Sequence, residues 1–318
     1  MTDELTIQVL LTGLGAALLS LLLTPLARSI MRRIGAVDEP GGRHVHTKPT
    51  PRGAGWAIVL SALFAAWLSG GDGNSLLHGL VAGLSVLVPV CIIDDIWGLP
   101  PLQRLLAQLV AATLAWKFGV RVEGITNLLS PVVGPVYLGL GWLSLPVTVL
   151  WLVLMTNAVN WLDGLDGLAA GVCAIASATV AYMACSAGMS PVAVMAAAIA
   201  GACLGFLRYN FHPASVFMGD TGSMALGLML AAVSTAGAFK TATAGSLLVP
   251  LLIGGLPLYD ALTTMWGRWR RGQPLYVADR THVHHRLLDR GYNVVQAVLV
   301  LYAATAALCI AAIVIWRL

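Results

Sequence analysis

The sequence predicts an all-α polytopic membrane protein, a bundle of about ten transmembrane helices whose polar loops gather on the cytoplasmic side. Of its 318 residues, 58% are hydrophobic and only 10% are charged, and the mean hydropathy is +0.84. Soluble domains carry about 25% charged residues, so this composition excludes a soluble fold. The apolar residues come in blocks of about 17 to 25, the length of helix that spans a hydrocarbon core. We therefore expect residues 1–318 to form a single integral-membrane domain.

The apolar blocks predict ten spans along the chain. The spans cover residues 5–27, 54–70, 77–94, 102–118, 142–159, 168–187, 190–207, 222–238, 245–266 and 294–316. No cleavable signal peptide is expected, because the first residues lack a basic region and the first apolar run is too long. Between the fourth and fifth spans, Val132-Val-Gly-Pro-Val-Tyr-Leu alternates around Gly-Pro, which predicts a short β-hairpin on the outer membrane surface.

The 18 basic residues are divided unevenly between the two ends of these spans. If the spans alternate in direction, four basic residues fall on one side (Lys117, Arg121, Lys240 and Arg317) and the other 14 fall on the opposite side. The positive-inside rule places the richer side in the cytoplasm and both termini outside. Most aspartates and histidines also fall on the cytoplasmic side, so we expect the chemistry at that membrane face.

The connection between the fifth and sixth spans carries four polar side chains in a short turn between two apolar runs. They are two carboxamides, Asn157 and Asn160, and two carboxylates, Asp163 and Asp166. Charge at such a place is costly unless the turn lies at a water boundary with cationic or metal partners. Helix capping is the alternative reading, but a cap requires one acceptor and not four polar groups at regular spacing.

Two further motifs place carboxylates at the same face. Asp94 and Asp95 end the third span, and adjacent carboxylates require a cation unless one of them holds a proton and serves as a base. Asp220 lies between glycines at the start of the eighth span, after Asn210 and Phe217. Glycines beside an aspartate favour close approach of a ligand, although Asp220 could also cap the helix.

Basic and histidine-rich loops complete the cytoplasmic face. The first loop holds Lys48 among glycines and prolines, a composition that suits an anion, although ordinary positive-inside basicity also explains it. The last loop holds Arg280, His282, His284 and His285. The flanking arginines disfavour zinc at these histidines and favour a phosphate. These loops suit a phosphorylated soluble substrate that meets a membrane-embedded one, and the chain has no Walker A motif.

Five motifs together resemble a known family. In order they are His46-Thr-Lys48-Pro-Thr-Pro-Arg52, Asp94-Asp95, Asn157-x-x-Asn160-x-x-Asp163-Gly-x-Asp166-Gly, Phe217-Met-Gly-Asp220-x-Gly-Ser and His282-x-His284-His285. They resemble the polyprenyl-phosphate N-acetylhexosamine-1-phosphate transferases, glycosyltransferase family 4, over nearly the whole chain. The resemblance implies a bundle of ten or eleven helices. It also implies Mg²⁺-dependent transfer of a sugar 1-phosphate from a UDP-sugar to a polyprenyl phosphate, with release of UMP and with Mn²⁺ as an alternative ion.

The final motif points to one branch of this family. Branches that transfer phospho-N-acetylmuramoyl-pentapeptide carry three adjacent histidines, whereas here Val283 interrupts the run. The motif is similar to that of the branch that transfers N-acetylglucosamine-1-phosphate to undecaprenyl phosphate in the bacterial inner membrane, for cell-envelope glycans such as O-antigen or teichoic acid. The resemblance implies no nucleic-acid partner and allows a homodimer. The muramoyl-pentapeptide transferase, a flippase or transporter of an anionic lipid-linked sugar, and an inactive scaffold stay open as alternatives.

The resemblance also implies a role for each site residue. Asp94 and Asp95 match the pair proposed to deprotonate the lipid phosphate. Asp220 matches the Mg²⁺ ligand, with Asn160 as a co-ligand. Asp163, Asp166 and His282 match further catalytic positions, and His282 is also expected, with Lys48 and Arg280, to hold the diphosphate or sugar. The expected substrate-binding residues are Lys48, Asn157, Asn210, Phe217, Arg280, His284 and His285. Direct attack by the lipid phosphate is favoured over a covalent aspartyl intermediate, and both stay open.

Overall fold

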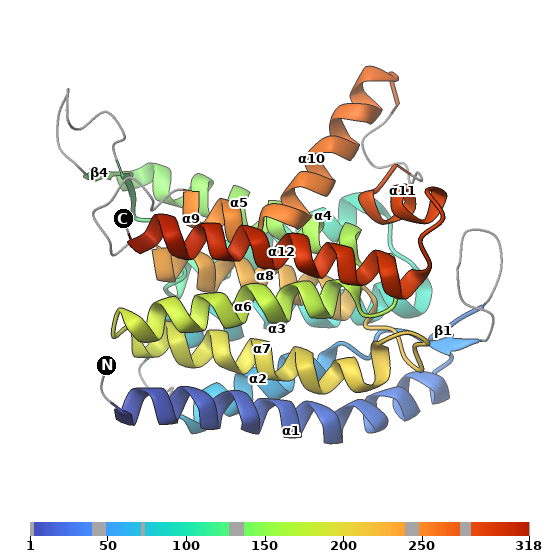
Figure 1. The fold of residues 1–318 in the computed structure, drawn as a ribbon, viewed down its shortest axis with the longest axis horizontal. Helices are drawn as coiled ribbons and strands as arrows, with labels where there is room; N and C mark the ends of the chain where they lie inside the picture. The colour runs from blue at the N-terminus through green and yellow to red at the C-terminus, as the bar shows by residue number, and fades with distance from the viewer. Residues whose placement is uncertain are drawn as a thin grey trace.

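A computed structural model of the chain describes residues 3–39, 49–70, 74–126, 137–238, 248–273 and 281–317. These residues form a helical bundle with two small antiparallel β-ladders (Figure 1). The helices are α1 (Asp3–Arg33), α2 (Trp56–Leu68), α3 (Ser75–Trp97), α4 (Pro101–Lys117), α5 (Ser144–Leu162), α6 (Leu168–Ser186), α7 (Ser190–Asn210), α8 (Gly219–Ala238), α9 (Leu248–Ile253), α10 (Gly255–Arg270), α11 (Val283–Asp289) and α12 (Val294–Arg317). The strands are β1 (Val37–Asp38), β2 (Thr50–Pro51), β3 (Gly124–Thr126) and β4 (Tyr137–Gly139).

Six helical segments of the described chain are long and apolar enough to cross a membrane. They are Asp3–Arg33, Ser75–Trp97, Gly141–Leu162, Leu168–Ser186, Ser190–Asn210 and Val294–Arg317. The prediction of an α-helical membrane protein is confirmed. Each of the ten expected ranges overlaps a described helix, while ten membrane crossings stay a prediction.

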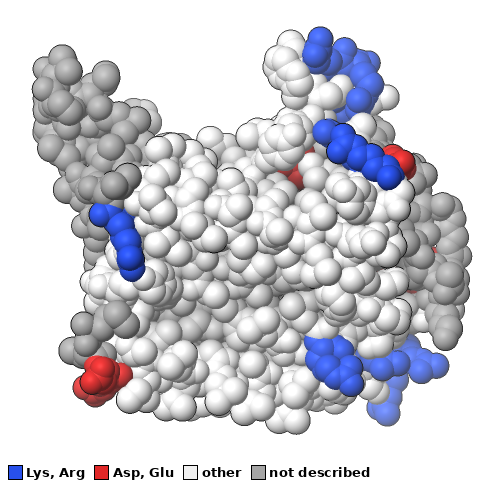
Figure 2. All heavy atoms as spheres, in the orientation of Figure 1, with Lys and Arg blue, Asp and Glu red and all other residues white. Residues whose placement is uncertain are grey.

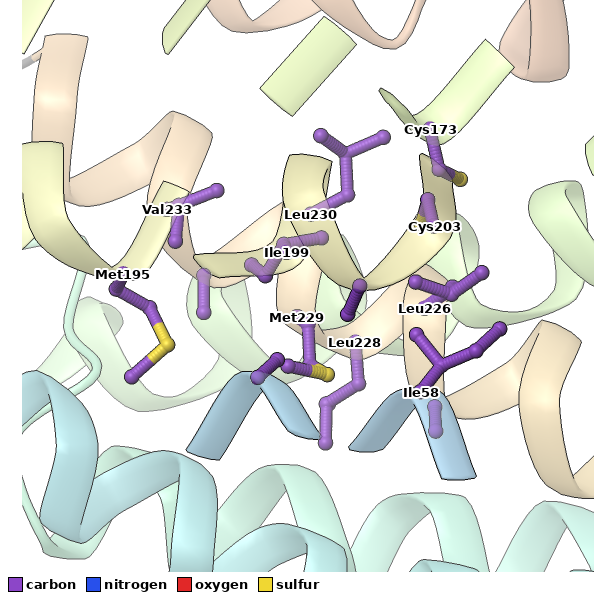
Figure 3. Close-up of a cluster of buried hydrophobic side chains, with 14 of the residues drawn as sticks. Ile58, Cys173, Met195, Ile199, Cys203, Leu226, Leu228, Met229, Leu230 and Val233 are labelled. Carbon is purple, nitrogen blue, oxygen red and sulfur yellow. The ribbon is translucent and has the colours of Figure 1, made fainter. Parts of the chain in front are cut away.

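Helices α6, α7 and α8 form the centre of the bundle, and small residues allow them to pack closely. Alanine, glycine and cysteine fill much of their length, so these helices are buried on most sides. Figure 3 shows part of this core, where Met195 and Ile199 of α7 lie with Met229 and Val233 of α8. Helix α1 lies against α7 with so little space that a Cβ on Gly201 would come within 1.9 Å of the carbonyl oxygen of Gly13.

The outer helices instead expose leucine and other apolar side chains. Helix α1 alone exposes Leu10, Leu14, Leu18 and Leu22 by more than half. Figure 2 shows a broad uncharged belt around the middle of this face, with charged side chains gathered toward its two ends. An apolar belt of this kind is the surface that a bilayer covers.

Both termini lie at one end of the bundle, and β1 and α11 lie at the other (Figure 1). The C-terminal ends of α3 and α5 therefore meet the N-terminal end of α8 at the end that is opposite the termini. This arrangement brings motifs that are distant in the sequence together.

The ninth expected span is wrong as a continuous helix. The chain breaks at Gly254 into α9 and α10, and α10 leans out of the bundle (Figure 1). Pro257 explains the break, because it has no N–H to donate and its ring collides with the carbonyl group one turn earlier. Glycines at positions 254 and 255 give the chain the freedom to turn there.

Two antiparallel ladders tie loops at opposite ends of the bundle. Strand β3 pairs with β4, with Ile125 opposite Leu138. Tyr137 and Leu138 belong to the segment expected to form an outer hairpin, but residues 127–136 lie outside the described part. The sequence did not predict the other ladder, in which Val37 of β1 lies opposite Pro51 of β2 and closes the base of the first loop.

Candidate active site

Asp95, at the end of α3, is fully enclosed by groups that donate hydrogen bonds. Its side chain has 0% exposure, and it accepts a hydrogen bond from Arg52 Nη2 at 3.0 Å. It also accepts hydrogen bonds from the backbone N–H groups of Asp220 and Thr221, both at 3.0 Å, and from Thr221 Oγ1 at 2.7 Å. The first N–H groups of a helix lack intrahelical partners, so Asp95 caps α8 from a different helix.

Gly219 makes this close contact between α3 and α8 feasible. Its φ of +68° is one that glycine adopts readily. A Cβ at Gly219 would come within 2.5 Å of Asp95 Oδ2. The glycine before Asp220, which the sequence suggested was for ligand approach, therefore also admits the capping carboxylate.

Asp94 has a different environment from its neighbour. Its Oδ1 accepts a hydrogen bond from the backbone N–H of Leu99 at 2.6 Å, and its Oδ2 lies 3.4 Å from Arg104 Nη1. The same Arg104 nitrogen lies 3.0 Å from Asp220 Oδ2, so one guanidinium bridges two carboxylates. Both aspartates line the same cavity, but Asp95 accepts hydrogen bonds from Arg52, Asp220 and Thr221, whereas Asp94 accepts them from Leu99 and Arg104.

Asp220 lies where α3, α4, α5 and α8 meet. Its Oδ1 accepts a hydrogen bond from Asn160 Nδ2 at 3.0 Å, and its Oδ2 accepts one from Arg104. Asn160 Nδ2 also donates to Ser223 Oγ at 2.9 Å, so this amide is held firmly at the end of α5. The sequence-predicted pair of Asp220 and Asn160 is therefore in direct contact.

Two cavities meet at this point. The first has a volume of about 370 Å³. Its walls include Arg52, Asn160, Asp163, Asp166, Asn210, His212, Phe217, Asp220 and His285. The second, of about 440 Å³, is lined by Arg52, Asp94, Asp95, Leu99, Arg104 and Asp220, among others. Arg52 and Asp220 belong to both, so two ligands could reach the same carboxylate from different sides.

The two aspartates of the turn after α5 differ in their surroundings. Burial raises the pKa of Asp163 to about 8, helped by the negative charges of Asp220, Asp95 and Asp166. Asp166 Oδ2 instead lies 2.8 Å from His212 Nδ1 and accepts the backbone N–H of Ala214 at 3.0 Å. Both aspartates line the first cavity, and Asp166 in addition fixes the connection between α7 and α8.

Asn210 and Phe217 stand on the wall of the first cavity. Asn210 Nδ2 donates to the carbonyl oxygen of Val216 at 3.0 Å. Its Oδ1 is buried and has no hydrogen-bond partner in the described chain. An unpaired buried acceptor is costly, so this oxygen is suited to a donor that a ligand supplies.

The three histidines occupy different environments. His282 Nδ1 lies 2.7 Å from Asp260 Oδ2, and Asp260, which is fully buried, also accepts the backbone N–H of Val283 at 2.7 Å. His285 lines the first cavity. No group of three or more His, Cys, Asp or Glu side chains within the described ranges is arranged to hold a metal ion.

His284 has a packing position and not the ligand-facing position expected of a substrate-binding residue. It is 2% exposed, and burial followed by the charge of His285 lowers its pKa to about 3. A Cβ at Gly164 would come within 2.3 Å of His284 Nε2. The neutral ring therefore packs directly on the turn that carries Asp163.

Asn157 also departs from the expectation that it binds substrate. Its Nδ2 donates to Gln108 Oε1 at 2.7 Å and to the carbonyl oxygen of Val153 at 2.8 Å. Its Oδ1 accepts from Gln108 Nε2 at 3.3 Å. Helix α5 turns this amide toward α4, one turn below Asn160. Lys48 and Arg280 lie outside the described residues, so their expected roles stay predictions.

Three residues that were not predicted from the sequence contact the site residues: Arg52, Arg104 and Asp260. A signal for Arg104 existed, because only three residues separate α3 from α4. Such a short connection places the first turn of α4 beside the last turn of α3, where an arginine meets two aspartates. The histidine partner of Asp260 lies 22 residues away, and no motif in the sequence connects the two.

Comparison with known proteins gives a consistent result. The sequence model of glycosyl transferase family 4 matches residues 77–238. A probable undecaprenyl-phosphate N-acetylglucosaminyl 1-phosphate transferase of Bacillus subtilis is 36% identical over 315 residues, covering 99% of this chain and 87% of the relative. A decaprenyl-phosphate N-acetylglucosaminephosphotransferase of Mycobacterium tuberculosis is 36% identical over 328 residues, covering 93% and 79%. A phospho-N-acetylmuramoyl-pentapeptide-transferase of Halalkalibacterium halodurans is 34% identical over 300 residues, covering 88% and 89%.

Proposed function

Because the chain belongs to glycosyl transferase family 4, we propose that it transfers N-acetylglucosamine-1-phosphate from UDP-N-acetylglucosamine to a polyprenyl phosphate and releases UMP. The observation that carries this proposal is the meeting of two cavities at Asp220, with Arg52 and Arg104 beside it. A reaction between two phosphorylated substrates requires two binding sites that share one polar centre. The names of relatives from Bacillus subtilis and Mycobacterium tuberculosis support the choice of sugar.

The first cavity suits the sugar nucleotide. Phe217 offers an aromatic face, and Asn210 Oδ1 offers a buried acceptor on the same wall. A flat heterocycle with an N–H donor, such as uracil, satisfies both groups. His285 and Asp163 line the remaining wall, where hydroxyl groups of the sugar nucleotide would find partners.

The second cavity suits the phosphate of the lipid. Arg52 and Arg104 supply positive charge there, and Asp94 supplies a carboxylate that can accept a proton from a phosphate monoanion. The first two turns of α4, which carry Arg104, also expose the side chains of Leu102, Leu105 and Leu106. A polyprenyl phosphate would therefore meet the charged cavity with its head group while its chain stays in the membrane.

In the transfer, an oxygen of the lipid phosphate attacks the phosphorus that carries the sugar. The bond from that phosphorus to the UMP oxygen breaks, and UMP leaves with the bonding electron pair. Both reactants are anions, and two unit charges about 4 Å apart repel by about 4 kcal/mol at an effective dielectric constant near 20. Arg52 and Arg104 reduce this repulsion and hold the phosphates in line.

Asp220 and Asn160 fit a Mg²⁺ ion at the junction of the cavities. Mg²⁺ usually takes one or two carboxylates and completes its shell with substrate phosphates and water. Asp220 is such a carboxylate, and the hydrogen bonds of Asn160 Nδ2 leave its Oδ1 as a neutral ligand. When bound, the ion would neutralise charge on the bridging phosphates. Mn²⁺ is the alternative ion.

We place the site at the cytoplasmic face of a bacterial inner membrane, with both termini outside. The basic asymmetry of the sequence supports this orientation, and the termini lie at the end of the bundle away from the site. Single cysteines introduced at positions 72 and 125 should react with an impermeant reagent from outside intact cells. Cysteines at positions 47 and 278 should react only after the membrane is opened, and labelling of position 278 from outside would overturn the orientation.

The proposed activity is tested with purified protein in detergent, a polyprenyl phosphate and Mg²⁺. UDP-N-acetylglucosamine should yield UMP, whereas UDP-N-acetylmuramoyl-pentapeptide should not. UMP release only from the muramoyl substrate would support the alternative transferase. Absence of UMP from both, in protein that unfolds cooperatively on heating, would refute the proposal.

A further inference from the structure

A second layer of contacting side chains, here called the lower layer, lies one helical turn from the candidate active site, toward the middle of the bundle. The four helices α3, α4, α5 and α8 form a ring, in which α3 and α5 each pack against α4 and α8. Each helix contributes one side chain to the lower layer: Cys91, Gln108, Asn157 and Met224. Cys91, Gln108 and Met224 are at most 3% exposed.

The lower layer is connected across the ring by short contacts. Gln108 and Asn157 exchange two hydrogen bonds, of 2.7 and 3.3 Å. Gln108 Nε2 also lies 3.5 Å from Met224 Sδ, and Cys91 Sγ lies 3.6 Å from the same sulfur. One amide of α4 therefore touches both α5 and α8.

This layer follows the site residues helix by helix. Gln108 lies four residues after Arg104, Asn157 three residues before Asn160, and Met224 four residues after Asp220. Residues three or four apart share one face of a helix, about one turn or 5.4 Å apart. Any sliding or rotation of α4 against α5 at the lower layer would consequently move Arg104 and Asn160, which hold the two oxygens of Asp220.

We propose that Gln108 and Asn157 are positioning residues, whose paired amides fix the register of α4 and α5 so that Arg104 and Asn160 hold Asp220 in its reactive orientation. An apolar pair at this depth would fill the same space but has no preferred direction, because apolar contacts are non-directional. Two reciprocal hydrogen bonds do impose a direction. This inference rests on the proposed transferase function, because the helix register that it describes positions Asp220 for that reaction.

The test exchanges the two amides. Gln108→Asn shortens the pair and Asn157→Gln lengthens it, while the double variant restores the combined length. Each single variant should lower kcat about 10- to 100-fold with KM for the UDP-sugar nearly unchanged, because small misplacements act on the reacting geometry. The kcat of the double variant should recover to within about threefold of the original value. Such a recovery would show that residues 108 and 157 are directly coupled.

A double leucine variant and a matched control separate an effect on the reacting geometry from an effect on folding stability. Gln108→Leu combined with Asn157→Leu leaves no buried amide unpaired, so the protein should fold with nearly unchanged thermal stability. Its kcat should nevertheless fall as in the single variants. The matched control is Gln103→Leu, the same chemical change at an exposed position of α4, which should leave kcat unchanged.

Hydrogen–deuterium exchange gives a readout that does not depend on activity. Exchange over residues 99–104 and 160–166 should rise in the leucine pair and stay unchanged in Gln103→Leu. Unchanged exchange in the leucine pair would overturn the inference, whether or not the protein releases UMP. Full turnover of the leucine pair, or failure of the exchanged pair to recover in an active protein, would also overturn it. An inactive original protein would refute the transferase alone, and the exchange measurement would still decide this inference.

Discussion

The adjacent carboxylates Asp94 and Asp95 should respond differently to the same chemical change. Asp95→Asn replaces one carboxylate oxygen with an NH₂ group, and the oxygens of Asp95 face Arg52 and Asp220 N–H on one side and Thr221 on the other. On the Arg52 side the NH₂ group faces two donors. On the Thr221 side it faces the backbone N–H of Thr221, since only the Thr221 hydroxyl can turn to accept a hydrogen bond. A hydrogen bond to a charged acceptor contributes about 1.5 to 3 kcal/mol, so the loss should be on the order of 3 kcal/mol of folding stability.

Asp94→Asn should instead leave the fold intact. Its remaining oxygen can still accept the Leu99 N–H, and Arg104 keeps Asp220 as a partner. If Asp94 accepts the proton of the lipid phosphate, the variant should lower kcat by about 10² to 10⁴, because general-base catalysis contributes that much. Its affinity for the UDP-sugar should change little.

Thermal unfolding in detergent and UMP release, measured on the same preparations, separate the two roles. The Asp95→Asn protein should unfold at a clearly lower temperature, and the Asp94→Asn protein should unfold at the original temperature with little turnover. Equal stability of both variants would contradict the capping role of Asp95. Full turnover of Asp94→Asn would show that Asp94 only ends a helix.

Three further predictions concern the last loop and the turn after α5. Asp260→Asn should weaken UDP-sugar binding about tenfold, because the amide can accept from only one of its two donors and His282 loses its orientation. Gly164→Ala should strongly reduce both folding and activity, because the new methyl group would collide with the His284 ring. The pKa of Asp163 is about 8 in the folded protein, against an ordinary value of 3.8. Between these two values the folded protein keeps the proton and the unfolded chain loses it. Asp163 should therefore lower the free energy of unfolding as pH rises from about 4 to 8.

Matched measurements decide each of these predictions. Isothermal titration with UDP-N-acetylglucosamine reports on Asp260→Asn, and unchanged affinity would contradict the orienting role. Gly139→Ala is the control for Gly164→Ala, since no atom of the described residues lies within 4 Å of its added methyl group. For Asp163, the unfolding temperature is measured against pH without added divalent ions. It should fall less steeply with pH in Asp163→Asn than in the original protein, and identical slopes would contradict the raised pKa.

Much of the fold could be predicted from the sequence, because apolar blocks indicate membrane helices and positive charges indicate their orientation in the membrane. It also predicted that Asp94, Asn160, Asp163 and Asp220 converge, since alternating spans bring the ends of distant helices to one face. The break before α10 could have been foreseen from Pro257 with its preceding glycines. The break was missed because the apolar block continues across it.

The division of roles between similar residues could not be read from the sequence. Asp94 and Asp95 are neighbours, but successive side chains of a helix point about 100° apart, and the partner of Asp95 on α8 lies 126 residues away. Asn157 matches a substrate-binding motif, yet its amide faces α4. Spacing shows which residues share a helix face, and only packing shows what that face meets.

The central claim is that two phosphates react beside Asp220, and one labelling experiment tests it most directly. UDP-N-acetylglucosamine labelled at the phosphorus next to the sugar is incubated with the protein, Mg²⁺ and a polyprenyl phosphate. The label should enter the lipid in equal amount to the UMP released, and Asp220→Ala should abolish both. Release of labelled UDP, with an unlabelled sugar on the lipid, would mean that the sugar–oxygen bond breaks and would contradict the account.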